Sequence, residues 1–168
     1  AQEINQLFDR VDKFMNEVSL AESTIPPNFG KKSLAQVLDD AACNLPPTSD
    51  GRLPYVDAEE IDPRVERENI WFKQALYRVI TEAMNNAIIH GHASHISVSI
   101  DRTRDFITVE VTNNGIPLPD DSELRKSRSG IFVLLEMFEK KLGAKHSIRI
   151  GPDGVGAQIF IRIPCLPF

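Results

Sequence analysis

The chain has 168 residues, of which 42% are hydrophobic and 26% charged, a composition typical of a folded globular protein rather than a disordered or fibrous one. Its 19 basic and 24 acidic residues give a net charge of −5, and this acidic balance argues against a nucleic acid as a partner. Neither Cys43 nor Cys165 has the spacing of a metal ligand, so the sequence predicts no zinc site and no disulfide framework.

No targeting or membrane-spanning segment is predicted. The apolar runs are shorter than the roughly 20 residues that cross a bilayer. The first ten residues, AQEINQLFDR, lack the basic and apolar regions of a signal peptide. We therefore expect a cytoplasmic location.

The first predicted element is an amphipathic helix near the N-terminus. Apolar residues recur from Ile4 to Val18 at three- and four-residue spacing. β-Branched residues occupy one heptad position, and Leu7 and Phe14 occupy another, a pattern that favours two-stranded association. Packing of this helix on its own domain is the alternative.

A second helix is predicted from Ser33, because Ser33-Leu34-Ala35-Gln36 has the pattern of a capping box. The prolines at 26 and 27 end the first helix, and those at 46 and 47 end the second. The stretch from Thr48 to Pro63 is rich in turn-forming residues. Its only indication of a strand is at Leu53, Tyr55 and Val56.

A long helix is predicted from about Glu66 to His90. The apolar residues on its buried side are Ala75, Leu76, Val79, Ile80, Ala83, Met84 and Ala87. At about 100° per residue, Glu82 and Asn86 lie roughly 40° apart on a stripe that flanks this apolar side. The two polar side chains therefore point in a similar direction.

Two hairpins and another helix complete the chain. The alternating residues of the first hairpin are Ile96, Val98 and Ile100, then Ile107, Val109 and Val111, and those of the second are Ile148 and Ile150, then Ala157, Ile159, Ile161 and Ile163. Between the hairpins, a helix is predicted from Gly130 to Leu142, with Gly143 just past its end.

The order helix, two strands, loop, helix, two strands predicts an α+β fold. We expect a two-layer sandwich, in which a mostly antiparallel sheet is covered by helices on one face. An N-terminal helical segment precedes it. We place that segment at residues 1–47 and the main domain at residues 48–168.

Four short motifs follow one another along this domain. They are Glu82-Ala83-Met84-Asn85-Asn86 on the long helix, Asn113-Asn114-Gly115 at a strand end, Ser129-Gly130 at a helix start and Gly154-Val155-Gly156 before the last strand. Singly, each is explained by a solvated helix face, a turn, a helix start or a hairpin. Together they resemble the gyrase, histidine kinase and MutL-type ATPase superfamily, most closely the sensor histidine kinases with a short ATP lid. The resemblance covers roughly Trp71 to Pro164.

This resemblance implies a site for ATP and magnesium. In that family the pattern Glu-x-x-x-Asn, here Glu82 and Asn86, supplies a catalytic acid/base near the transferred phosphate and an amide that holds magnesium, with Asn85 beside it. Asn113 and Gly115 correspond to the residues at adenine. Magnesium is a hard ion satisfied by oxygen ligands and phosphates, so an amide oxygen suits it.

The chain departs from the family at two of its nucleotide-binding sequence motifs, called boxes. The family's Asp-x-Gly-x-Gly maps onto Asn113, Gly115 and Pro117, so an amide replaces the acid. Its carbonyl can still accept a hydrogen bond from the adenine amino group, but the loss of charge predicts nucleotide binding weaker by about 1–2 kcal/mol. Gly130 is the only glycine of the third box, where backbone amides at a helix start bind phosphate.

The loop from Leu118 to Ser129 corresponds to the lid. Arg125, Lys126 and Arg128 are candidate phosphate contacts, because cationic side chains pair with polyphosphate. Ser129 joins Gly130 at the phosphate-facing helix start. A solvated loop is the alternative for the three cations. His90 either faces the phosphates or serves the helix C-terminus.

The resemblance implies the ATP-binding catalytic domain of a bacterial two-component sensor histidine kinase. The γ-phosphoryl group of ATP would pass to a histidine outside this chain, so the isolated chain is expected to bind nucleotide without labelling itself. Gln2 to Val18 look like the second dimerisation helix. The phosphoacceptor helix is expected upstream of Ala1 or absent.

The expected partners are that dimerisation helix and a response regulator, with a homodimer in the full-length protein. The chain would be the cytoplasmic part of a membrane-anchored sensor if one precedes it. Two alternatives stay open. A degenerate, non-catalytic module acting as scaffold or regulator is favoured by Asn113 and Pro117, and residues 86–91 also resemble an anti-sigma-factor serine kinase.

Overall fold

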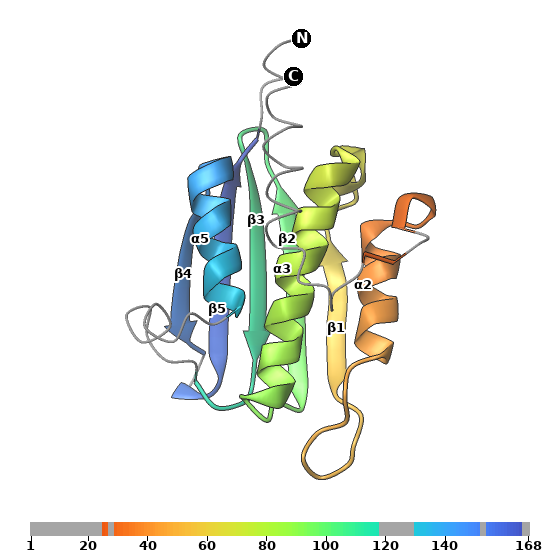
Figure 1. Cartoon of the computed structure of the whole chain (residues 1–168), viewed down its shortest axis with the longest axis vertical. Helices are drawn as coiled ribbons and strands as arrows, with labels where there is room; N and C mark the ends of the chain where they lie inside the picture. The colour runs from red at the N-terminus through yellow and green to blue at the C-terminus, as the bar shows by residue number, and fades with distance from the viewer. Residues whose placement is uncertain (1–24, 27–28, 118–129, 152–153, 166–168) are drawn as a thin grey trace.

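The computed structural model describes residues 25–26, 29–117, 130–151 and 154–165. Its elements are η1 (Phe29–Lys31), α2 (Leu34–Cys43), β1 (Tyr55–Ile61), η2 (Pro63–Arg67), α3 (Ile70–Ile89), β2 (His95–Arg102), β3 (Phe106–Asn113), α5 (Gly130–Leu142), β4 (Lys145–Ile150) and β5 (Ala157–Pro164). Figure 1 shows α2, α3 and α5 side by side on one face of a five-stranded sheet.

The sheet has the strand order β1-β2-β3-β5-β4. Strand β1 is parallel to β2, and the other neighbouring pairs are antiparallel. The predicted α+β sandwich with a mostly antiparallel sheet is therefore confirmed. Both predicted hairpins are also confirmed, as β2 with β3 and β4 with β5.

Strand β1 is the element that the sequence indicated least. It covers Tyr55–Ile61 and pairs with β2 at the edge of the sheet, with an irregular register between Asp57 and Glu60. Its burial does not alternate regularly, because an edge strand with a bulge does not present one clean face to the core. A period-two pattern was therefore missing from the sequence.

The long helix begins later than predicted. α3 starts at Ile70, with Asn69 as its N-cap, rather than at Glu66. Residues 63–67 form a separate 3-10 helix that is capped by Asp62. Glu66 has a non-local role, since its Oε1 accepts a hydrogen bond of 2.7 Å from the backbone of Leu34 at the start of α2.

Helices α2 and α5 follow their local sequence signals. Ser33 and Gln36 form the predicted capping box at the start of α2. At the end of α5, Gly143 has φ +68° and the amide of Ala144 donates to the carbonyl of Phe138. This bond satisfies one of the carbonyls that the last helical turn leaves open.

One hydrophobic core lies between the helices and the sheet. Its largest fully buried side chains are Phe138, Leu34, Leu38, Leu76, Ile80, Met84, Ile96, Ile100, Ile107, Ile131 and Leu135. Leu34 and Leu38 of α2 belong to this core together with residues of α3, α5 and the sheet. The boundary after residue 47 stays a prediction, as does the association of the helix at residues 4–18, which lies outside the described residues.

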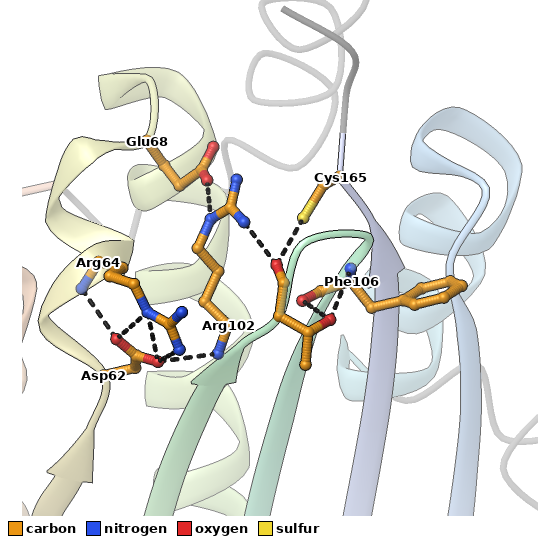
Figure 2. A network of polar contacts seen from close by, with 7 residues as sticks. Asp62, Arg64, Glu68, Arg102, Phe106 and Cys165 are labelled. Atoms are coloured by element: carbon orange, nitrogen blue, oxygen red, sulfur yellow. Dashed lines mark hydrogen bonds and ion pairs between the residues drawn. The ribbon is translucent and has the colours of Figure 1, made fainter.

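A network of polar contacts lies at the end of the sheet where a turn connects β2 to β3 (Figure 2). Arg102 Nε donates to Glu68 Oε1 over 2.7 Å, which links β2 to the segment before α3. Asp62 accepts from the side chain of Arg64 and from the backbone of Arg102. None of the described helices is long and apolar enough to cross a membrane.

Candidate functional site

Parts of three elements lie at the opposite end of the sheet, the lower end in Figure 1. They are the C-terminal half of α3, the end of β3 and the start of α5. Each carries one of the motifs singled out in the sequence. The topology therefore gathers residues that are up to 48 positions apart, from Glu82 to Gly130.

Glu82 of α3 and Gly130 of α5 lie close together at this site. A β-carbon built on Gly130 would lie 2.7 Å from Glu82 Oε1. The carboxylate therefore lies directly beside the first residue of α5, where the backbone amides have no acceptor inside the helix. Only glycine leaves room for this contact with the carboxylate in its present position.

Asn85, Asn86 and His90 occupy the last turns of α3. The carbonyl of Asn86 accepts hydrogen bonds from the backbone amides of His90 and Gly91, at 3.0 and 3.1 Å. The side chains of Asn85 and Asn86 are half-buried, whereas His90 is the exposed C-cap. The backbone of Asn86 is thus fixed by the helix end, while its amide side chain makes no hydrogen bond within the part of the chain that the structure describes.

Gly115 lets the strand end pass close to the end of α3. The amide of Ile116 donates to the carbonyl of Gly91 over 2.7 Å, and a β-carbon on Gly115 would overlap that carbonyl. Gly115 therefore acts here through its small size. This close approach holds the Asn-Asn-Gly turn against α3.

Asn113 lies on the helix-facing side of β3. It follows Ile107, Val109 and Val111 in the alternation of buried residues and is itself 8% exposed. Its Oδ1 accepts a hydrogen bond of 2.9 Å from the backbone amide of Gly115. The carbonyl that the sequence assigned to adenine is thus already used within the turn.

Asn114 has a structural role that its place in the Asn-Asn-Gly motif did not indicate. Its Oδ1 accepts from the backbone amides of Ser94 and His95, both at 3.0 Å, and its Nδ2 donates to Ser94 Oγ. Asn114 therefore fastens the start of β2 to the end of β3. The two adjacent asparagines thus point to different partners.

Arg78 is a charged neighbour of the site that the helical pattern did not single out. It is buried, although it lies four residues before Glu82 on the same helix. Burial lowers the pKa of Arg78, and the nearby carboxylate of Glu82 opposes this effect. A buried cation on α3 thus faces the charge of Glu82.

Four predicted site residues, Arg125, Lys126, Arg128 and Ser129, lie outside the described residues, so their contacts with phosphate stay predictions. Within the described ranges, no group of three or more His, Cys, Asp and Glu side chains could hold a metal ion. The carboxylate of Glu82 and the amide oxygen of Asn86 are hard oxygen donors. They fit a magnesium ion whose other ligands are phosphates and water.

Comparisons with known proteins concern the family and the fold. A family model described as "Histidine kinase-, DNA gyrase B-, and HSP90-like ATPase" matches residues 73–164. The signal transduction histidine-protein kinase/phosphatase DegS of Bacillus subtilis (strain 168) is 31% identical over 94 residues, which is 55% of this chain and 24% of that protein. This chain spans at most 24% of the length of the curated relatives it matches.

Two solved structures share the fold. The blue-light activated histidine kinase of Erythrobacter litoralis EL346 has a TM-score of 0.64 at 16% identity, covering 97% of this chain and 59% of that chain. The ATP binding domain of PrrB from Mycobacterium tuberculosis has a TM-score of 0.55 at 19% identity, covering 81% and 96%. At these identities the likeness is one of fold.

Proposed function

This chain belongs to the histidine kinase-, DNA gyrase B- and HSP90-like ATPase family, and we propose that it is the catalytic domain of a sensor histidine kinase. It would bind ATP with magnesium and transfer the γ-phosphoryl group to a histidine outside this chain. The observation that carries the proposal is that the start of α5 lies beside Glu82, at the end of the sheet where β3 ends with Asn113.

The purine lies against the end of β3 in this proposal. Asn113 is the polar group on an otherwise apolar strand face, and Gly115 leaves room for the close turn beside it. The phosphates extend towards α5, where the amides at Gly130 bind them. Arg125, Lys126, Arg128 and Ser129 complete this end, and His90 stands at the neighbouring end of α3.

Glu82 takes part directly in the transfer of the phosphoryl group. The bond between the γ-phosphorus and the bridging oxygen of ATP breaks, a bond to the histidine nitrogen forms, and ADP leaves. Glu82 takes the proton of the attacking imidazole. Asn86, next to Asn85, would hold magnesium, which when bound neutralises charge on the phosphates. Most of the rate gain in such transfers comes from positioning and charge stabilisation.

The partners follow from the same proposal. DegS is named a signal transduction histidine-protein kinase/phosphatase. We propose a dimerisation helix that carries the accepting histidine, a response regulator and a full-length homodimer, all in the cytoplasm. Residues 2–18 would supply the second dimerisation helix.

One observation favours a second candidate, a non-catalytic module that serves as a scaffold or regulator. The carbonyl of Asn113 already accepts a hydrogen bond from Gly115, and the amide lacks the charge and the second acceptor oxygen that a carboxylate would present to adenine. A domain of this kind would keep the fold and have no measurable affinity for nucleotide.

Titration calorimetry of the chain with ATP, with and without magnesium, tests the proposal. We expect a dissociation constant below about 1 mM that weakens at least tenfold when magnesium is removed. Asn86→Ala should abolish the magnesium dependence, whereas Gln74→Ala, about three turns earlier on α3, should leave it unchanged. Absence of binding by the folded wild-type chain would instead support the scaffold.

A further inference from the structure

Asn113 stands out among the described residues as a buried polar group aimed at the helix layer. Among those residues, the buried polar or charged side chains are Thr48, Arg78 and Asn113. Asn113 is the last residue of β3, the central strand of the sheet, and is paired with Ile96 on one side and Ala157 on the other. Its backbone is therefore held by two neighbouring strands, and its side chain starts from a fixed position.

The orientation of the Asn113 amide follows from its partner. The backbone amide of Gly115 is a donor, and it lies 2.9 Å from Asn113 Oδ1. The opposite orientation would place the Nδ2 amino group against this N–H group, which gives two donors and no acceptor. Oδ1 must therefore face Gly115, and Nδ2 must face away from it.

The Nδ2 group is the end of Asn113 that is available to a ligand. It donates no hydrogen bond to any other residue in the part of the chain that the structure describes. A primary amide nitrogen carries two hydrogens and no lone pair that accepts a hydrogen bond. The site thus presents a donor at the point where the acid of related ATPases presents an acceptor.

The turn cannot readily rearrange to reverse this polarity. A β-carbon on Gly156 would overlap the carbonyl oxygen of Asn113, and one on Gly115 would overlap the carbonyl of Gly91. The backbone on both sides of the asparagine is therefore in tight contact with its neighbours. A fixed donor selects ligands by hydrogen-bond complementarity, because a buried donor without an acceptor is costly.

We propose that Asn113 makes this site prefer purine nucleotides with an oxygen at position 6, guanine or hypoxanthine, over adenine. The inference rests on the proposed nucleotide site and concerns which base it accepts. Adenine carries a donor N6 amino group, which would meet the Nδ2 donor, whereas guanine carries the acceptor O6. Hypoxanthine has the same oxygen without the 2-amino group of guanine. GTP or ITP, rather than ATP, would then be the better phosphoryl donor.

The test measures the affinities of the magnesium complexes of ATP, GTP and ITP by calorimetry. For the wild-type chain we expect GTP and ITP to bind about tenfold more tightly than ATP. Asn113→Asp keeps an acceptor for Gly115 and replaces the donor by a second acceptor. This variant should reverse the order and favour ATP.

Asn114→Asp is the matched control, since it makes the same chemical change one residue later. The acceptor that Asn114 presents to Ser94 and His95 is retained, so the ratio of GTP to ATP affinity should stay as in the wild type. Circular dichroism confirms that each variant is folded. Wild-type binding of ATP as tight as, or tighter than, GTP and ITP overturns the base preference alone. Binding of none of the three overturns the proposed nucleotide site and this inference with it.

Discussion

Gly130, the first residue of α5, lies against the carboxylate of Glu82 on α3. A β-carbon built on Gly130 would be 2.7 Å from Glu82 Oε1. The two residues bring the start of α5 to the carboxylate that we propose to be catalytic. Because Oε1 is the far end of a flexible side chain, a small residue at 130 would move the carboxylate rather than prevent folding.

Gly130→Ala is therefore expected to separate stability from activity. In a form of the protein that includes its dimerisation helix, histidine phosphorylation should fall by about tenfold to a hundredfold, because displacement of a reacting group by about 1 Å is enough. The unfolding free energy should change by less than about 1 kcal/mol. Val133→Ala, at an exposed position of the same helix, should change neither quantity.

Gly154 and Gly156 offer a second matched comparison, since both have φ +73°. A β-carbon on Gly154 would meet open space, whereas one on Gly156 would overlap the carbonyl of Asn113. Urea unfolding should show that Gly154→Ala lowers the free energy of unfolding by about 1 kcal/mol, because of backbone strain alone. Gly156→Ala should lower the free energy of unfolding by about 2–4 kcal/mol, since overpacking adds to the same strain. Equal losses would contradict the proximity of β3 and β5 at this point.

Leu38→Ala tests whether α2 is part of the common core. Leu38 is fully buried with residues of the sheet and of α3. Its truncation should destabilise the whole domain by about 2–5 kcal/mol in a single cooperative transition. Asp39→Ala at the exposed neighbouring position should cost less than about 0.5 kcal/mol. Two transitions, with only the first affected, would show that residues 1–47 fold independently.

The stability of the domain should depend on pH in the acid range because of Asp62. Hydrogen bonds from Arg64 hold the pKa of this carboxyl well below its ordinary value of 3.8. The charged form is therefore favoured in the folded state, so its stabilisation is present above about pH 4 and is lost as the pH falls below that. Urea unfolding between pH 5 and about pH 2 should show this decline.

Asp62→Asn should flatten that part of the pH profile. The amide can still cap η2, but it has no charge to lose. Asp39→Asn, on the exposed side of α2, provides the comparison and should follow the wild-type profile. A wild-type slope that persists in Asp62→Asn would assign the acid sensitivity to other carboxylates.

The sequence by itself determined the elements whose signals are local. The capping box of α2, the alternation of β2 and β3, and the glycine after α5 each depend on residues within a few positions. Such signals arise from backbone conformation and from the burial of one face, which a stretch of sequence carries within itself. The four motifs on these elements were also sufficient to indicate the family.

Tertiary structure alone decided where the remaining polar groups are used. The carboxylate of Glu66 caps α2 from 32 residues away, so the predicted helix start was wrong. β1 pairs with β2 at an edge where the sequence lacked alternation. The sequence contained Asn113 and Gly115, but only the packing of β3 beneath α3 and α5 buries that amide. A hydrogen-bond donor becomes selective when its surroundings exclude water and fix its direction. For Asn113 the direction comes from Gly115, two residues further along, whereas the burial comes from chain segments distant in sequence.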